Sequence, residues 1–222
     1  EVLTLIFTAM DSSHLSLIDE ASNALIKVSK NQNLSDNHLN KIEELVLRLA
    51  QRAFQLHLFK STIINDQYSM LIKDHVEYDL SILVPVLLKL GTLKEPEIPI
   101  EKYIHYVKSN DKELLPLVLE LVESTFTSNT KKFILPLIDP DIKPSKVAIG
   151  LFDTKFLPKD DFLLLWMESN HIWKKNISLD YCLKNEKINL LKKIDWKSIN
   201  NIKTDYNFLD KTEKLYLNRN FI

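Results

Sequence analysis

The chain has 222 residues, of which 45% are hydrophobic, and a formal net charge of −1. An apolar fraction of this size builds a continuous core, and the near-zero charge excludes the overall basic excess typical of nucleic-acid binding. The charge is uneven, because residues 171–222 carry 11 Lys or Arg and 6 Asp or Glu, a local balance of +5. A solvated helix surface explains this excess most simply, and an acidic partner or a membrane surface is the alternative.

Glycine is scarce, since Gly91 and Gly150 are the only two in the chain. Sheets, tight hairpins and phosphate-binding loops use positive backbone dihedral angles, which glycine adopts at low cost. Apolar residues instead recur at helical spacing from Val2 to Leu217. We therefore predict an all-α protein, an α-solenoid of stacked antiparallel helix pairs. No Gly-rich phosphate loop, Gly-x-Ser-x-Gly motif or dinucleotide fingerprint is present, and we expect no enzymatic activity.

Capping residues and prolines divide the chain into predicted helices. Ser12 or Ser13 should cap the second helix, and Ser35 should open the longest one. Gly91 should end a helix from a left-handed C-terminal position, and Asn110 should cap the helix that follows it. The predicted helices cover residues 2–10, 13–30, 36–60, 65–73, 78–90, 100–108, 111–126, 129–138, 145–152, 159–168, 172–183 and 209–218.

Cysteine content and hydropathy limit the cellular setting. Cys182 is the only cysteine, so no internal disulfide can form, which is typical of a reducing compartment. No run approaches the roughly 18 apolar residues of a membrane-spanning helix. Residue 1 is Glu and an apolar run begins directly after it, so we expect the chain to be a piece of a longer protein.

Three segments form a weak internal repeat, namely residues 70–80, 106–116 and 166–176. In each, the pattern predicts an apolar helix end, a tight polar turn and the start of a new helix. The first offset of 36 residues suits paired-helix repeats, and the second of 60 would hold the proline-rich loop 139–144 and a further helix. A general helical domain with coincidental spacing is the alternative.

Two stretches carry a family resemblance: residues 112–125, KELLPLVLELVEST, and residues 131–139, KKFILPLID. They resemble the degenerate HEAT-like repeats that follow the membrane part of bacterial proteins related to ADP/ATP translocases of the major facilitator type. Residues 52–59 and 166–183 are similar to the flanking repeats, so the resemblance covers about residues 45–222. Alanines and arginines that are common in HEAT helices are replaced here by Ile, Lys and Asn.

The resemblance implies a HEAT- or armadillo-like solenoid on the cytoplasmic face of a membrane, as part of a larger protein. In that family a cyclic-nucleotide-binding domain often follows, and residues 209–222 look like the short helix that leads into it. The resemblance implies no catalytic residue and no cofactor for this chain. We predict one helical domain over 1–222, with N-terminal helices over 1–62, degenerate repeats over 63–185 and a C-terminal cap or linker over 186–222.

Metal and acid–base chemistry find little support in the sequence. None of the six histidines has another at the i, i+4 spacing of a zinc-binding helix, and we expect no bound metal. The adjacent acids Glu43 and Glu44 point about 100° apart on a helix, so we interpret them as surface charges. Asp139 and Asp141 flank Pro140 in a loop, where turn formation is favoured over cation binding.

The basic C-terminal quarter supplies the predicted contact residues, which are Lys174, Lys175, Lys192, Lys193 and Trp196. Trp196 is expected to be an exposed anchor, whereas Trp166 and Trp173 are expected in the core. We expect a non-enzymatic scaffold or coupling domain, whose partners are proteins or adjacent domains of the same chain, without nucleic acid. A membrane would be met only through an N-terminal part beyond these residues.

A helical-repeat protein that acts on nucleic acid, like the alkylpurine DNA glycosylases, is the alternative function. That class needs a basic concave channel with an acid and aromatic residues. Here Asp180 and Trp166 or Trp173 would have to supply the acid and the aromatic, beside the four lysines. Only three arginines occur in the chain, which weighs against this alternative because arginine is the usual reader of bases and phosphates.

Overall fold

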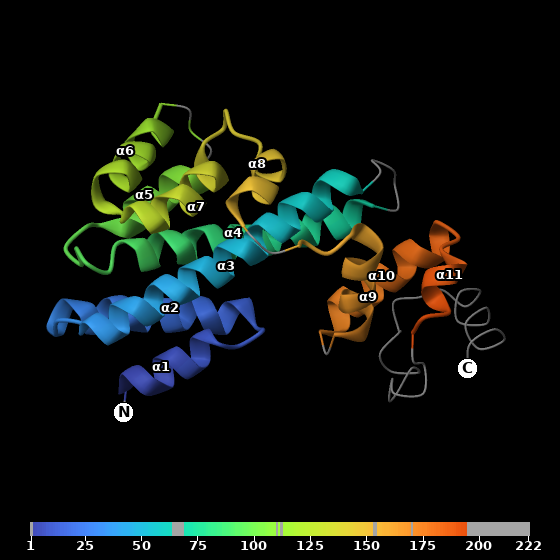
Figure 1. Cartoon of the computed structure of the whole chain (residues 1–222), viewed down its shortest axis with the longest axis horizontal. Coiled ribbons are helices and arrows are strands. Elements are labelled where there is room, and N and C mark those ends of the chain that lie inside the picture. Colours follow the sequence, from blue (N-terminus) through green and yellow to red (C-terminus); the bar gives the residue numbers. More distant parts are fainter. Residues whose placement is uncertain are drawn as a thin grey trace. The chain divides into compact units, whose positions relative to one another are not determined.

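The computed structural model describes residues 2–63, 69–109, 111, 113–152, 155–169 and 171–194. All regular secondary structure within these ranges is helical, which confirms the all-α prediction (Figure 1). The predicted helix 209–218 and the predicted cap Asn110 lie outside the described residues.

The chain divides into two compact units. Unit 1 comprises residues 1–58 and 77–155, and unit 2 comprises residues 59–76 and 156–222. The helices α3 (Asp36–Thr62) and α4 (Met70–Gly91) each contribute residues to both units. The sequence-based division of the chain, which rests on the repeat pattern, stays a prediction.

The described residues of unit 1 form six complete helices besides its parts of α3 and α4. They are α1 (Val2–Met10), α2 (Leu15–Asn31), α5 (Ile100–Ser109), α6 (Leu115–Thr125), α7 (Ser128–Ile138) and α8 (Pro144–Leu151). Neighbours along the chain contact each other: α1 with α2, α5 with α6, α6 with α7, and α7 with α8. Fully buried apolar side chains such as Leu25, Phe54 and Leu87 form the core, because each helix turns one apolar stripe inward.

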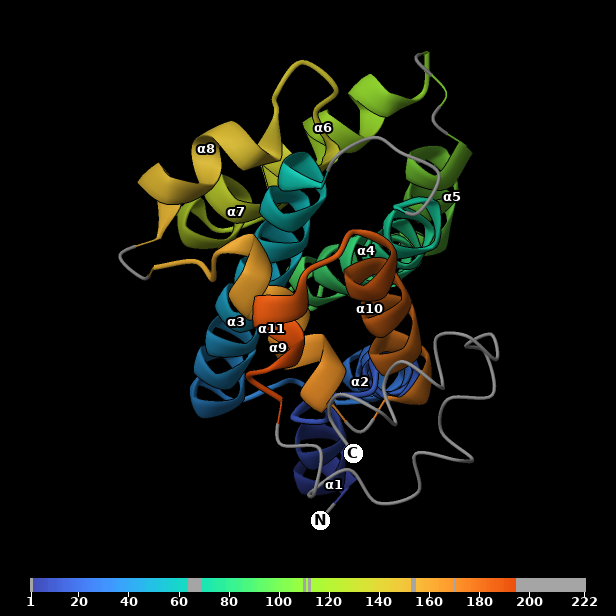
Figure 2. The same ribbon diagram turned by 90° about the vertical axis from the view of Figure 1, so that its right-hand side faces the viewer.

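Unit 2 contains α9 (Lys159–Glu168), α10 (Ile172–Lys184) and the short α11 (Ile188–Leu191), which are labelled in Figure 2. α10 contacts both α9 and α11. The core is aromatic, because the Phe59 ring centroid lies 4.5 Å from that of Phe162 and 5.4 Å from that of Trp166. Trp166 is therefore a core residue, as predicted.

Helix starts agree with the sequence where a side chain caps them. α3 begins at Asp36, and the Ser35 hydroxyl accepts a hydrogen bond from the His38 backbone N at 3.4 Å. The predicted cap of α2 is wrong, because the helix begins at Leu15 with His14 as its N-cap residue. The Ser12 hydroxyl instead accepts from the His14 backbone N at 3.0 Å, so it stabilises the turn before the helix.

The predicted break between residues 73 and 78 is wrong, since α4 is continuous from Met70 to Gly91. No glycine or proline stands at residues 74–77, and Ile72, Val76 and Leu83 are all fully buried along the helix. Tertiary burial of this stripe outweighs the local polarity that suggested a turn. The repeat segment 70–80 therefore has no turn, whereas a helix ends and another begins in 106–116 and in 166–176.

Gly91 has a different role from the predicted one. No described glycine has a positive φ, and Gly91 is the last residue of α4. A Cβ atom at this position would lie well inside van der Waals contact distance of the Phe126 ring, which is buried. Glycine therefore lets the end of α4 approach α6, instead of supplying a left-handed turn.

We expect Gly91→Ala to destabilise unit 1 by about 1–2 kcal/mol, because overpacking against Phe126 outweighs the gain in helix propensity. Gly150→Ala is the matched control, since a Cβ there meets no atom within 4 Å. That control should be neutral or stabilise by up to about 1 kcal/mol. Urea denaturation followed by circular dichroism measures both variants, and equal effects would contradict the packing role of Gly91.

Glu186 is the one non-glycine residue with a positive φ in the described part of the chain, at 52°. It follows α10, where the Lys187 backbone N donates to the Cys182 carbonyl at 2.8 Å and closes the helix end. We expect Glu186→Gly to stabilise unit 2 by about 0.5–1 kcal/mol, because glycine removes the left-handed cost. Tryptophan fluorescence during urea denaturation tests this, and Glu186→Ala, which retains the cost, should give no gain.

Candidate functional site

Four of the five predicted contact residues are described, and all four lie in unit 2. Lys174 and Lys175 are half-buried in the first turn of α10, and Lys192 and Lys193 are exposed after α11. Trp196 lies outside the described residues. The Lys174 ammonium group lies 5.3 Å from the centroid of the buried Trp166 ring, so this lysine covers part of the core.

The residues that a nucleic-acid-acting site would require are mostly buried. Asp180 is 4% exposed, and its carboxylate lies 2.5 Å from the Lys184 ammonium group. Trp166 is also 4% exposed. Trp173 is 44% exposed, so its predicted core position is wrong. Neither Asp180 nor Trp166 is placed to contact a base.

The two described arginines hold the turn between α1 and α2 against α3. The Arg48 guanidinium donates to the Asp11 carboxylate at 2.6 Å and to the Met10 carbonyl at 3.2 Å. Arg52 donates to the Ser13 carbonyl at 3.3 Å. Burial lowers the pKa of Arg52 and the nearby Asp79 carboxylate opposes this shift. Both arginines therefore serve the fold of unit 1.

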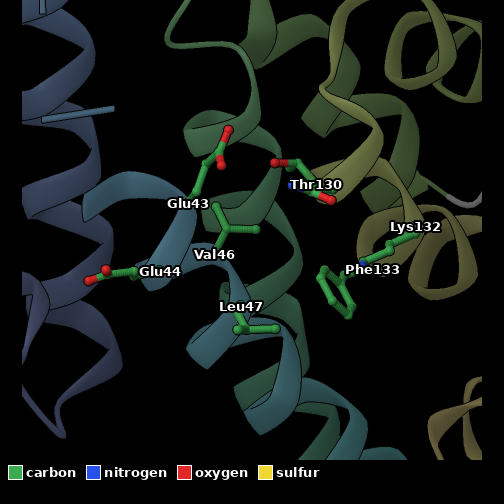
Figure 3. A pocket seen from close by; sticks show the side chains of 8 residues that line it. Glu43, Glu44, Val46, Leu47, Thr130, Lys132 and Phe133 are labelled. Atoms are coloured by element: carbon green, nitrogen blue, oxygen red, sulfur yellow. The ribbon is translucent and has the colours of Figure 1, made fainter. Parts of the chain in front are cut away.

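A groove of about 320 Å³ lies between α3 and α7 in unit 1 (Figure 3). Its lining residues are Glu43, Glu44, Val46 and Leu47 of α3, and Asn129, Thr130, Lys132 and Phe133 of α7. Each set follows helical spacing of three and four residues, which places its members along one side of the helix. A volume near 300 Å³ is at the lower end of ligand-binding sites.

The floor of the groove is apolar. Val46 and Phe133 are buried, while Leu47 is 43% exposed. In Figure 3 the Leu47 side chain and the Phe133 ring face each other across the groove, and Glu43 and Thr130 lie at one end. A half-exposed leucine beside buried apolar side chains leaves apolar surface in water, which a bound apolar group would cover.

The two sides of the groove carry opposite charges. Glu43 and Glu44 belong to α3, and the Glu43 carboxylate lies 4.0 Å from the Lys94 ammonium group. No cation pairs with Glu44 in the described part of the chain. On α7, the Lys132 ammonium group lies 4.7 Å from the centroid of the Phe133 ring. The groove therefore has an acidic side and a basic side around an apolar floor.

A second hollow of about 340 Å³ lies on the other side of Glu44, which lines both. It is bordered by Phe7, Lys41 and the ion pair of Arg48 with Asp11. The Lys41 ammonium group lies 5.8 Å from the Phe7 ring centroid. Because its charges are largely engaged, this second hollow offers fewer free groups to a partner than the groove does.

The sequence predicts Glu43 and Glu44 to be surface charges, but it does not reveal the groove that they line. One sequence feature points to an exposed apolar site, because Leu47 interrupts the polar face of a long helix. What was missing is the pairing of α3 with α7, whose groove-lining residues lie more than 80 positions apart in the chain. No periodicity within either helix specifies which partner it packs against.

Within the described ranges, no group of three or more His, Cys, Asp or Glu side chains is arranged to hold a metal ion. No helix among those described combines the length and the apolar character needed to cross a bilayer. Comparison with protein-family models, with curated proteins and with solved structures finds no match.

Proposed function

We propose that this chain is a non-enzymatic helical scaffold or coupling domain that binds protein, either a separate partner or an adjacent domain. The observation that carries the proposal is the open groove between α3 and α7. Its apolar floor and charged sides are typical of the surfaces with which helical domains bind other helices. The contact would be made by side chains already in place, without a change in fold.

The proposal extends to a HEAT- or armadillo-like solenoid. Contacts between successive helices, from α5 to α8 and from α9 to α11, support it because solenoid repeats contact their nearest neighbours. The resemblance of residues 112–125 and 131–139 to repeats that follow a membrane part also supports it. In that setting the domain lies in the cytoplasm, at the membrane face, and transmits small movements between its neighbours.

The gene's reading frame on both sides of these residues tests the coupling role. We expect hydrophobic membrane spans upstream and a glycine-rich β domain downstream. A frame that starts near Glu1 and stops at Ile222 would overturn the coupling role. A salt-dependent DNA titration then tests the alternative, because binding through lysines weakens steeply as salt rises.

A further inference from the structure

We infer that the groove between α3 and α7 binds an amphipathic helix of a partner protein, whose apolar stripe is flanked by basic residues on one side and acidic residues on the other. The inference rests on the proposed function, because it specifies the partner of the same groove. It follows from three properties of the groove: its floor, the backbone groups around it and its charges.

The floor selects an apolar side chain. Leu47 is half-exposed between the buried Val46 and Phe133, so a leucine-sized group inserted there would remove apolar surface on both partners from water. A volume of about 320 Å³ leaves room for large side chains from successive turns of one helix. Polar groups inserted into this floor would lose hydration without gaining enough hydrogen-bond partners.

The walls favour a helix over an extended peptide. An extended segment binds well where a sheet edge offers unpaired backbone N–H and C=O groups. Both walls of this groove are helices, and α3 pairs its backbone groups internally where it lines the groove. On α7 the first turn and the Lys132 carbonyl, which has no N–H partner at Pro136, are exceptions, but they do not form the continuous row of N–H and C=O groups that a sheet edge offers. A bound helix also satisfies its own backbone groups and presents only side chains to the floor.

The charges fix the flanks of the bound helix. Glu44, which points outward from the floor in Figure 3, and Glu43, which lies 4.0 Å from Lys94, form the acidic edge on α3 that attracts lysine or arginine. Lys132 on α7 attracts glutamate or aspartate. The neighbouring Lys131 is engaged with the Glu123 carboxylate at 3.0 Å, which leaves Lys132 as the basic group at the groove. A helix with the same charge on both flanks would place like charges together on one side and lose affinity there.

Designed helical peptides of about 18 residues, or about five turns, test the inference by fluorescence anisotropy. All carry the same leucine stripe, and the flanks are Lys on one side and Glu on the other, Lys on both, or Glu on both. We expect the mixed peptide to bind about tenfold more tightly than either uniform peptide, since each exposed ion pair contributes up to about 1 kcal/mol. Equal affinities would overturn the charge assignment.

A charge reversal in the protein sharpens the test. In Glu43→Lys/Glu44→Lys both sides of the groove are basic, so preference should shift to the peptide with Glu on both flanks. Glu20→Lys/Glu120→Lys makes the same change in net charge at exposed positions of α2 and α6, away from the groove, and should leave the preference unchanged. Circular dichroism of both variants checks that each one folds before its peptide affinities are compared. A shift of preference in the control, or none in the groove variant, would overturn the inference.

The apolar contribution is tested separately with Leu47→Ala, which should lower the affinity for the mixed peptide about tenfold. Leu17 on α2 is similarly exposed, so Leu17→Ala is the control and should leave this affinity unchanged. If none of the peptides binds but the reading frame encodes neighbouring domains, the amphipathic-helix partner is refuted and the coupling role is retained. Binding with the predicted preferences in a chain without neighbouring domains would refute the coupling role and retain the groove.

Discussion

Asp19→Ala is expected to lower the free energy of unfolding of unit 1 by about 3 kcal/mol, because it leaves a buried cation without its closest anion. The Lys89 ammonium group, in a residue only 5% exposed, lies 2.9 Å from the Asp19 carboxylate and donates to the side-chain amide oxygen (Oδ1) of Asn23 at 2.6 Å. The next carboxylate, of Glu101, is 3.9 Å away. These remaining acceptors place the loss at the lower end of the range for broken buried pairs.

The double variant Asp19→Ala/Lys89→Met should recover most of this loss, because an apolar side chain of similar length replaces the uncompensated charge. Asp11→Ala is the control, since its ion pair with Arg48 is solvent-exposed and should contribute less than about 1 kcal/mol. Circular dichroism must follow the urea denaturation, because all three tryptophans lie in the residue range of unit 2. Equal losses for Asp19→Ala and Asp11→Ala would contradict the buried role of Lys89.

Alkaline pH is expected to destabilise unit 2 through its single cysteine. Burial raises the pKa of the Cys182 thiol from 9.0 to about 12, with the Lys187 charge opposing the shift and the Asp160 charge adding to it. Between pH 9 and 12 the unfolded thiol is ionised while the folded one retains its proton. The folded state then binds more protons, so its stability falls by about 1.4 kcal/mol per pH unit in that window and is unaffected below it.

Cys182→Ala isolates this effect from the titration of lysines and tyrosines, which the variant shares. Tryptophan fluorescence during urea denaturation at pH 8 to 10.5 gives the two stability curves. We expect a constant offset below about pH 9, from the cavity that alanine leaves, and a steeper decline for the unsubstituted protein above it. Parallel curves through pH 10.5 would show that the thiol is not held in its protonated form.

Individual helices were largely predictable because local signals determine them. α9 occupies the predicted residues 159–168, and α5 and α7 differ from prediction by one residue. Capping hydroxyls explain part of this agreement, as at Thr127, whose side chain accepts from the Thr130 backbone N. Proline and polar turns account for much of the rest, since they interrupt helical hydrogen bonding within a few residues.

The structure differs from the helix pattern predicted from the sequence where contacts between residues far apart in the chain decide the conformation. A polar stretch at 74–77 suggests a turn, yet burial of Ile72 and Val76 keeps α4 continuous. Gly91 suggests a left-handed helix end, yet its role is to leave space for the Phe126 ring, which a Cβ atom at this position would overlap. Buried Lys89 also reads as a surface charge in the sequence, because its partners Asp19 and Asn23 lie at least 66 residues away.

The sequence by itself determined the all-α class, most helix positions and the absence of an internal disulfide. Hydrophobic periodicity and capping residues act over a few neighbouring positions, and a single cysteine has no second cysteine in the chain to pair with. Only the tertiary structure decided that α3 and α7 form a groove, that Lys174 covers Trp166, and that Asp180 is buried. Each of these depends on which helix faces meet, and a helix with one apolar stripe can bury it against many partners.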